Sequence, residues 1–271
     1  MAAETPYEVR RLESWGEFLE VITDTPFLGW AFRGQRNEQW PLVSALSRYL
    51  RNFRVDTTVW GAQEERILRI FKRKAHHFLN VGPLPDDDLE WLALMQHHGA
   101  PTRLLDFTWS PYVAAFFALH SAVGDAAVWA FNPAQISPDS ADRERPLFQS
   151  TIDPIGRDDF RRYFLKHEIP LVWVGEPQSM NRRLIAQSGT FAIPGILNQS
   201  IEEILGAYPD PKHTLVKFIL PSEKIRDKGL RDLYRMNITH ATLFPDLDGL
   251  ARSLAYELEF HWAYDPHTRP G

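Results

Sequence analysis

The sequence predicts an α+β fold, with a mixed or antiparallel β-sheet flanked by helices. Amphipathic helical stripes and short runs rich in β-branched and aromatic residues alternate irregularly along the chain. No repeated strand–helix–strand unit, the pattern typical of a parallel sheet, is present. The chain has 271 residues, of which 44% are hydrophobic, enough to bury a full core. We therefore expect one domain over residues 1–271.

Apolar spacing and capping residues predict the helices in turn. Ser14 and Glu17 form a capping box before a helix that ends near Ile22. A long helix should follow at about 59–79. The next helix, at about 86–98, should begin at acidic residues and end before Gly99 and Pro101. Ser110 should cap the helix that Pro111 begins, and Ser222 another. Two further helices are expected at about 181–187 and 246–258.

Short extended segments predict the strands. The first, in LGWAFRGQ, should run to Phe32, with Gly34 as the breaker, so Arg33 should stand at the strand end or just past it. Two stretches that look loose are interpreted as long surface insertions, and whether the first is an excursion or a lid stays open. The other strands are expected at 102–108, 126–131, 169–174, 189–193 and 214–220, and the insertions at 132–160 and 197–213.

Composition narrows the classes of function. The net charge is −5 with both signs interspersed, which indicates no footprint for long nucleic acid or an anionic membrane. A local basic cleft is still compatible with this charge. The absence of cysteine excludes disulfides, a thiolate nucleophile and zinc–thiolate sites. The chain starts without a signal-peptide apolar block and has no run of roughly 20 apolar residues. We expect a cytoplasmic protein.

Residues 95–111, MQHHGAPTRLLDFTWSP, concentrate polar side chains within an apolar stretch. The polar groups of such a segment either bond to one another and hold the fold together, or they form the wall of an active site. Arg103 and Asp106 stand three residues apart, so a buried ion pair between them is the structural interpretation. His97 would complement a helix C-terminus in the same interpretation. In the functional one, these groups face a cavity.

Four motifs resemble the FRG domain family, named after its (F/Y)RG motif. The resemblance spans about residues 25–195 and leaves 196–271 as a C-terminal α/β extension. The motifs are Phe32-Arg33-Gly34-Gln35, Trp40-Pro41-Leu42, Gln96-His97-x-Gly99-x-Pro101-Thr102-Arg103-Leu104-Leu105-Asp106, and Arg183-x-x-x-Gln187-x-Gly189-x-Phe191.

A weaker resemblance is to the ADP-ribosyltransferase superfamily of the arginine–serine–glutamate type. Phe32-Arg33-Gly34 is similar to its first motif, and Thr108-Trp109-Ser110 with the following helix is similar to its second. This resemblance implies a split β-sheet core and NAD as substrate. The third motif departs from the pattern, because Glu257 and Glu259 lie on a predicted helix and point to roughly opposite sides. Gln187 would take the third place, although an amide cannot act as a general base.

The resemblances imply a role for each candidate residue. Arg33 would grip the pyrophosphate of NAD with its forked guanidinium, and His97 would bond a ribose hydroxyl. Asp106 would stabilise positive charge or lock Arg103, and Gln187 would orient the sugar or the acceptor. The expected catalytic residues are Arg33, His97, Asp106 and Gln187, and the expected NAD-binding residues are Arg33, Gln35, Gln96, Arg103 and Thr108; Trp30, Trp40, Phe107 or Trp109 would stack on a ring.

The sequence thus favours an FRG-domain protein that binds NAD or a related nucleotide in a cleft, as an ADP-ribosyltransferase or NAD glycohydrolase. Two alternatives stay open. One is a non-catalytic nucleotide- or partner-sensing module in microbial stress or phage defence. The other is a nucleic-acid-processing enzyme, which would need its arginines clustered in a groove. We expect no metal, since His76-His77 and His97-His98 are adjacent pairs that lack the i, i+4 spacing. The sequence does not identify the acceptor of the ADP-ribose. The arginines that a nucleic-acid groove would need are Arg33, Arg36, Arg48, Arg51 and Arg54.

Overall fold

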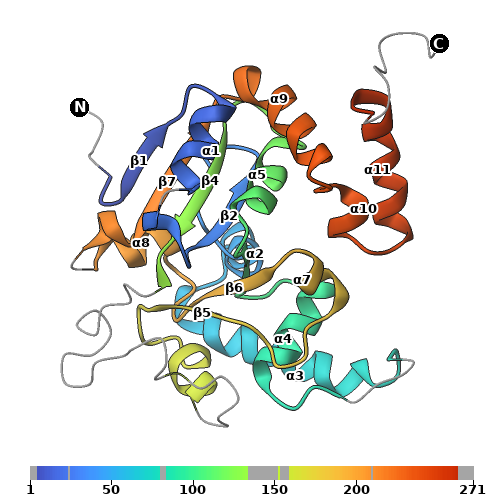
Figure 1. Ribbon diagram of the computed structural model, residues 1–271. Helices are drawn as coiled ribbons and strands as arrows, with labels where there is room; N and C mark the ends of the chain where they lie inside the picture. The colour runs from blue at the N-terminus through green and yellow to red at the C-terminus, as the bar shows by residue number, and fades with distance from the viewer. Residues whose placement is uncertain are drawn as a thin grey trace.

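A seven-stranded mixed sheet organises the molecule (Figure 1). The computed structural model describes residues 5–23, 25–79, 84–133, 152, 159–208 and 210–261. The strand order is β1-β7-β4-β2-β3-β6-β5, with β1 and β7 parallel and every other pair antiparallel. This confirms the predicted α+β class. The strands are β1 (Glu8–Arg11), β2 (Ala31–Gln35), β3 (Leu105–Thr108), β4 (Ala126–Phe131), β5 (Val172–Gly175), β6 (Gly189–Pro194) and β7 (Leu215–Leu220).

The helices begin largely at the predicted caps. The Ser14 hydroxyl accepts a hydrogen bond from the backbone N–H of Glu17 at 3.1 Å. The Ser110 hydroxyl accepts one from the backbone N–H of Val113 at 3.3 Å, and Pro111 is the first helical residue. The helices are α1 (Trp15–Thr23), α2 (Ala45–Asn52), α3 (Trp60–Ala75), α4 (Asp88–His97), α5 (Pro111–Leu119), α7 (Arg182–Ala186), α8 (Ile201–Gly206), α9 (Ser222–Arg235), α10 (His240–Leu243) and α11 (Leu247–Glu259), with a π-helical turn η5 (Arg161–Leu165).

Helices cover both faces of the sheet. Because successive strand residues point to opposite faces, Val128 packs with α1, α5 and α9, whereas Trp129 packs on the other face with α8. At the β6–β5 end, Trp173 packs with α3 and α4. Figure 1 shows these groups, with α1, α5 and α9 around β4 and β7, and α3 and α4 beside β5 and β6.

The sheet opens between its two central strands. β2 pairs with β4 over five positions, and β3 pairs with β6 over four. Among the described residues, β2 and β3 pair only at Phe32 and Thr108. The strands therefore diverge from Arg33 onward, and a space opens at the middle of the sheet. The predicted likeness of this core to ADP-ribosyltransferases stays a prediction.

The first strand extends further than the sequence indicated. Arg33 lies inside β2, and Gly34 does not break it. The glycine serves a different purpose, because a Cβ at position 34 would lie 1.9 Å from the carbonyl oxygen of Ala114 in α5. The helix can pack closely on β2 only because position 34 has no side chain.

Other boundaries also differ from the prediction. Segment 197–213 is not wholly loose, since Ser200 and Glu203 form a capping box that starts α8. The long helix ends at Ala75 and not near 79. Ser222 is the first residue of α9, and Pro221 stands at the cap position. The possible lid in 132–160 falls mostly outside the described residues. None of the described helices has both the length and the apolarity to cross a membrane.

Candidate functional site

A cavity of about 660 Å³ lies where β2 and β3 diverge. This volume is within the range of small-molecule sites, roughly 300–1,000 Å³. Its walls come from β2, β3, α2, α5 and the residues before β6, so elements far apart in the chain meet here. The residues lining it are Phe32, Arg33, Gly34, Gln35, Arg36, Trp40, Pro41, Val43, Arg48, Arg51, Asn52, Asp106, Phe107, Thr108, Phe117, His120, Ser121, Arg183 and Gln187.

Arg33 spans the gap between the two strands. Its Nη1 donates to the backbone carbonyl of Asp106 at 2.5 Å. Its Nε is buried and has no hydrogen-bond partner within the described part of the chain. Burial lowers the pKa of Arg33, the Asp106 carboxylate raises it, and Arg48 lowers it, but an arginine stays protonated. Arg33 is thus a cation with a free donor, and it lines the cavity.

The cavity is strongly cationic. Five of its lining residues are arginines, and the only acidic one among the described residues that line it is Asp106. The Asp106 carboxylate accepts the Gln96 amide at 2.7 Å. Such an excess of guanidinium groups favours a polyanionic ligand. The arginines are Arg33, Arg36, Arg48, Arg51 and Arg183.

Local contacts hold most of these arginines in place. Arg48 donates to the Val43 carbonyl at 2.6 Å, and Arg51 donates to the Asn198 carbonyl at 3.0 Å. Arg36 lies 4.9 Å from the centre of the Trp40 ring, and Arg183 lies 4.6 Å from that of Phe244. These contacts reduce the entropy that the side chains would lose when a ligand binds.

Three polar wall residues make structural contacts as well. Thr108 Oγ1 donates to the Gln187 carbonyl at 2.7 Å, and the Gln187 amide donates to the Leu243 carbonyl at 3.0 Å. Gln35 accepts from the Trp129 indole at 2.8 Å. Gln187 therefore ties α7 to α10 while it lines the cavity.

A second hollow of about 180 Å³ adjoins the first. Arg33, Arg48 and Asp106 line both, together with Val43, so these residues stand at the junction. Gln96 lines only the smaller hollow. A ligand that extends through the junction would place its central part beside two arginines.

His97 lies apart from these cavities. It is exposed in the last turn of α4 and lines neither hollow among the described residues. Partial burial lowers the pKa of His97, with His98 and Arg183 acting in the same direction and Asp246 opposing them. The cavity thus brings together Arg33, Gln35, Asp106, Thr108 and Gln187, but not His97, Gln96 or Arg103.

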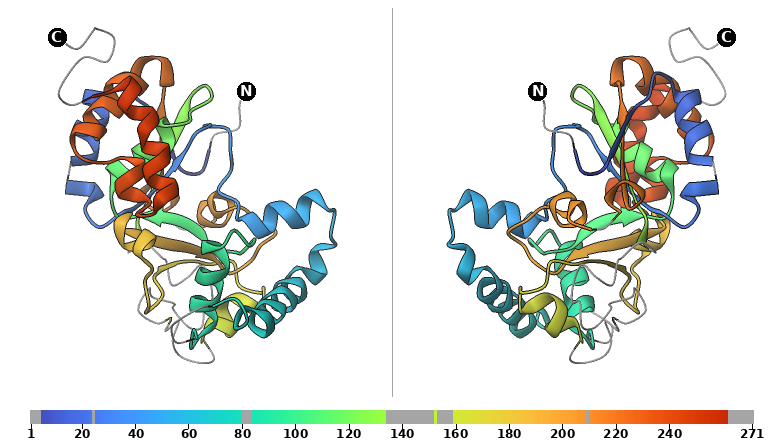
Figure 2. Two further views of the ribbon diagram at one scale, coloured as in Figure 1. Left: turned by 90° about the vertical axis from the view of Figure 1, so that its right-hand side faces the viewer. Right: turned by 90° about the vertical axis from the view of Figure 1, so that its left-hand side faces the viewer.

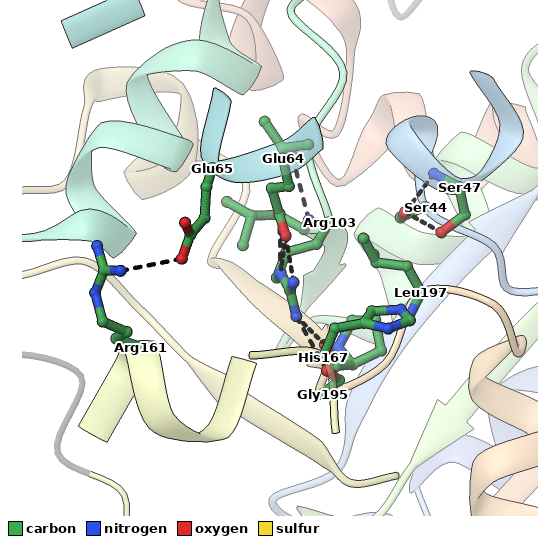
Figure 3. Close-up of polar contacts among 12 residues, drawn as sticks. Ser44, Ser47, Glu64, Glu65, Arg103, Arg161, His167, Gly195 and Leu197 are labelled. Carbon is green, nitrogen blue, oxygen red and sulfur yellow. Dashed lines mark hydrogen bonds and ion pairs between the residues drawn. The ribbon is translucent and has the colours of Figure 1, made fainter. Parts of the chain in front are cut away.

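Arg103 has a different partner from the one the sequence indicated. It is fully buried and pairs with Glu64 of α3, so the predicted ion pair with Asp106 is replaced by one with a distant residue. Its Nη1 also donates to the Pro194 carbonyl at 2.8 Å. Figure 3 shows this pair enclosed between α3 and the chain after β6. Arg103 lines neither described cavity, so its contacts are those of a structural residue.

Sequence reasoning missed Arg183 and His120 as cavity residues. Arg183 belongs to the fourth motif, which was the available signal, whereas nothing near His120 in the sequence indicates a site. The arginine cluster was foreseen only as a requirement of nucleic-acid binding, and four of its five members line the cavity. Among the described residues, no group of three or more His, Asp or Glu side chains is placed to hold a metal.

Comparison with protein families identifies the central region. Residues 29–126 match the family model of the FRG domain. The chain carries an FRG domain. The match includes β2, α2 and the segment through β3, which provide most of the cavity wall. Neither the curated proteins nor the solved structures gave a match.

Proposed function

We propose that the cavity of the FRG domain binds NAD or a related nucleotide and that the protein cleaves the nicotinamide–ribose bond. One observation carries the proposal: among the residues that the structure describes, five arginines and one carboxylate line a single cavity at the opening of the sheet. Guanidinium forks match phosphate oxygens in geometry and charge. A pyrophosphate flanked by two nucleosides supplies both the charge and the length for the two joined hollows.

The residues at the junction suggest where each part of the ligand binds. Arg33 and Arg48 would hold the pyrophosphate, since both line both hollows. Trp40 and Phe107 offer apolar faces for a base in the large cavity. Gln35 and Thr108 would contact the sugars there, and Gln96 would contact the group in the small hollow.

The chemistry assigns Asp106 to the reacting sugar. The bond from the anomeric carbon to the nicotinamide nitrogen breaks, and its electron pair leaves with nicotinamide. Water or another nucleophile then adds to the ribose and releases its proton to the solvent. Positive charge develops on the ribose in the transition state, and a nearby carboxylate stabilises it. Asp106 is the acidic candidate among the described cavity residues, and Gln187 would orient the sugar.

Labelled NAD tests the proposal. The wild-type protein should bind NAD, raise its melting temperature with it and release nicotinamide. Arg33→Ala should weaken binding by about 10- to 150-fold, the cost of roughly 1.5–3 kcal/mol for a charged hydrogen bond. Arg33→Lys should recover little, because an ammonium lacks the fork. Arg69→Ala, on the exposed surface of α3, is the matched control and should behave as wild type.

Asp106→Asn separates catalysis from binding. Release should fall by at least tenfold while NAD still raises the melting temperature, because the amide keeps the shape and loses the charge. Binding by the wild type without any release would identify a non-catalytic sensor. The absence of both binding and thermal shift would refute the nucleotide proposal.

A further inference from the structure

We propose that single-stranded nucleic acid docks on the exposed side of α2, at the mouth of the arginine cavity. The inference goes beyond the proposed function, and it names a macromolecular partner for the surface beside that site. Its evidence is separate, because it comes from residues outside the nucleotide cavity as well as from the charge around it. It concerns binding alone and includes no chemical step.

The segment from β2 through α2 is one of the basic stretches of the chain. Residues 33–54 hold five of the 30 Lys and Arg residues and only one of the 35 Asp and Glu residues, Glu38. The net charge of −5 therefore hides a basic segment. Four of its arginines line the cavity, and Arg54 follows α2 directly. A phosphate backbone is the polymer that complements such a segment.

α2 presents a different chemistry on each side. Leu46 and Leu50 are buried against Trp60. A second side carries cavity residues, among them Arg51 and Asn52. The side that remains is exposed and aromatic. Figure 2 shows α2 at the edge of the molecule in both views, where a long ligand has access to it.

Tyr49 and Phe53 form that aromatic side. Their exposed fractions are 54% and 73%, and their rings stack with centroids 6.1 Å apart and an interplanar angle of 20°. Residues three or four apart are neighbours on a helix surface, so Tyr49 adjoins both Phe53 and the cavity residue Asn52. The aromatic pair therefore begins where the cavity wall ends.

Trp40 extends the pattern inside the mouth. It lines the cavity, is 43% exposed, and lies under the guanidinium of Arg36. Exposed aromatic rings beside a basic track are the features with which proteins bind single strands, because unpaired bases stack on the rings while phosphates meet the cations. An acidic peptide would use the arginines but would have no flat rings to place on Tyr49 and Phe53. Paired bases would be unavailable for stacking.

Fluorescence anisotropy with the full chain tests the inference. The probe is a labelled single-stranded oligonucleotide of about 12 nucleotides, as DNA and as RNA. Tyr49→Ala and Phe53→Ala should each weaken binding by about tenfold or more, and Tyr49→Phe and Phe53→Tyr should preserve it. Phe78→Ala removes an aromatic side chain that is 79% exposed at another place, and it should change nothing. Arg51→Ala should lower the salt slope by about 0.7.

Several outcomes would overturn the inference. These are alanine variants that bind like the wild type, equal affinity for the duplex of the same sequence, and equally effective competition by polyglutamate. The last would identify a surface that recognises charge alone. Melting temperatures of the variants exclude unfolding as the cause of lost binding.

The same preparations separate the two proposals. Wild-type protein that binds NAD but no oligonucleotide refutes this inference and leaves the proposed function standing. Protein that binds the oligonucleotide but not NAD refutes the proposed function and leaves this inference standing. The Tyr49→Ala, Phe53→Ala double variant should still show the thermal shift with NAD, because neither ring lines the cavity.

Discussion

Two arginines of the FRG domain use the same group in opposite ways. Arg103 is enclosed with Glu64, both side chains having no exposed surface, and its remaining donors meet backbone carbonyls. Arg33 bonds one carbonyl, lines both hollows and keeps a buried Nε without a described partner. A guanidinium whose donors are all satisfied stabilises the fold, whereas one that lines a cavity and donates to a single carbonyl keeps donors for a ligand.

Glu64→Gln should destabilise the protein by about 3 kcal/mol or more, because it leaves the buried Arg103 without a counter-charge. Glu65→Gln is the control, since Glu65 pairs with Arg161 on the surface (Figure 3) and should cost less than about 1 kcal/mol. Chemical denaturation measures both. Equal stability changes in the two variants would contradict the structural role assigned to Arg103.

Motifs in the sequence predict several of the cavity residues but not the partner of Arg103. Arg33, Gln35, Asp106, Thr108 and Gln187 could be selected from motifs, and they do line one cavity. Local spacing proposed Asp106 as the partner of Arg103, yet the true partner lies 39 residues earlier in the chain. The spacing of residues in the sequence carries no information on such a contact, because it depends on how α3 packs against the chain after β6.

At the scale of elements, β2 is shaped by its contact with α5. The Gly34 Cα faces the helix so closely that any side chain would meet the Ala114 carbonyl. Gly34→Ala should therefore push α5 from β2 and destabilise the protein by about 1–3 kcal/mol or more. Gly16→Ala is the control. Its Cβ would have no contact nearer than 3.8 Å, and alanine favours α1 by about 0.5–1 kcal/mol. Thermal melting distinguishes the two, and a neutral Gly34→Ala would contradict the packing argument.

Elements with strong local signals were predictable, and those that depend on tertiary packing were not. The run AAVWAF is β4 at its predicted bounds, since its six residues are all buried. α2 was missed because only Leu46 and Leu50 mark its apolar side among arginines and polar residues. β1 was missed because three of its four residues are charged, and it is ordered by pairing with β7, which lies about 200 residues later in the chain.

At the scale of the whole molecule, net charge is a poor guide to the site. The chain is acidic on average, while the opening of the sheet gathers five arginines. Four of those arginines lie within residues 33–51, and the fifth, Arg183, is far from them in the chain. The strand order brings Arg183 to the others, because α7 leads into β6, and β6 pairs with β3 beside β2.

The C-terminal helices dock through a cluster of rings that includes two histidines. His240 at the start of α10 is buried, its ring centroid 5.1 Å from that of His120 at the end of α5, and its Nδ1 has no partner within the described residues. Burial, with His120 and Arg252 acting in the same direction, lowers the pKa of His240 from 6.5 to about 4. Burial lowers the pKa of His120 as well. Both therefore stay neutral in the folded protein at neutral pH.

This arrangement makes stability depend on pH with a defined sign. Between pH 6.5 and 4 the unfolded chain binds a proton at His240 that the folded chain does not, so acidification lowers the free energy of unfolding. From pH 7.5 to 5 the loss from this group should approach about 2 kcal/mol. His240→Phe keeps a ring among Phe116, Phe244 and Tyr256 and removes the titration, so its stability relative to the wild type should rise by that amount over the same interval. His77→Asn, at an exposed side chain without an ion pair among the described residues, is the control and should follow the wild-type profile. Denaturation at the two pH values measures each difference, and an unchanged difference for His240→Phe would show that the docked histidine does not set the acid sensitivity.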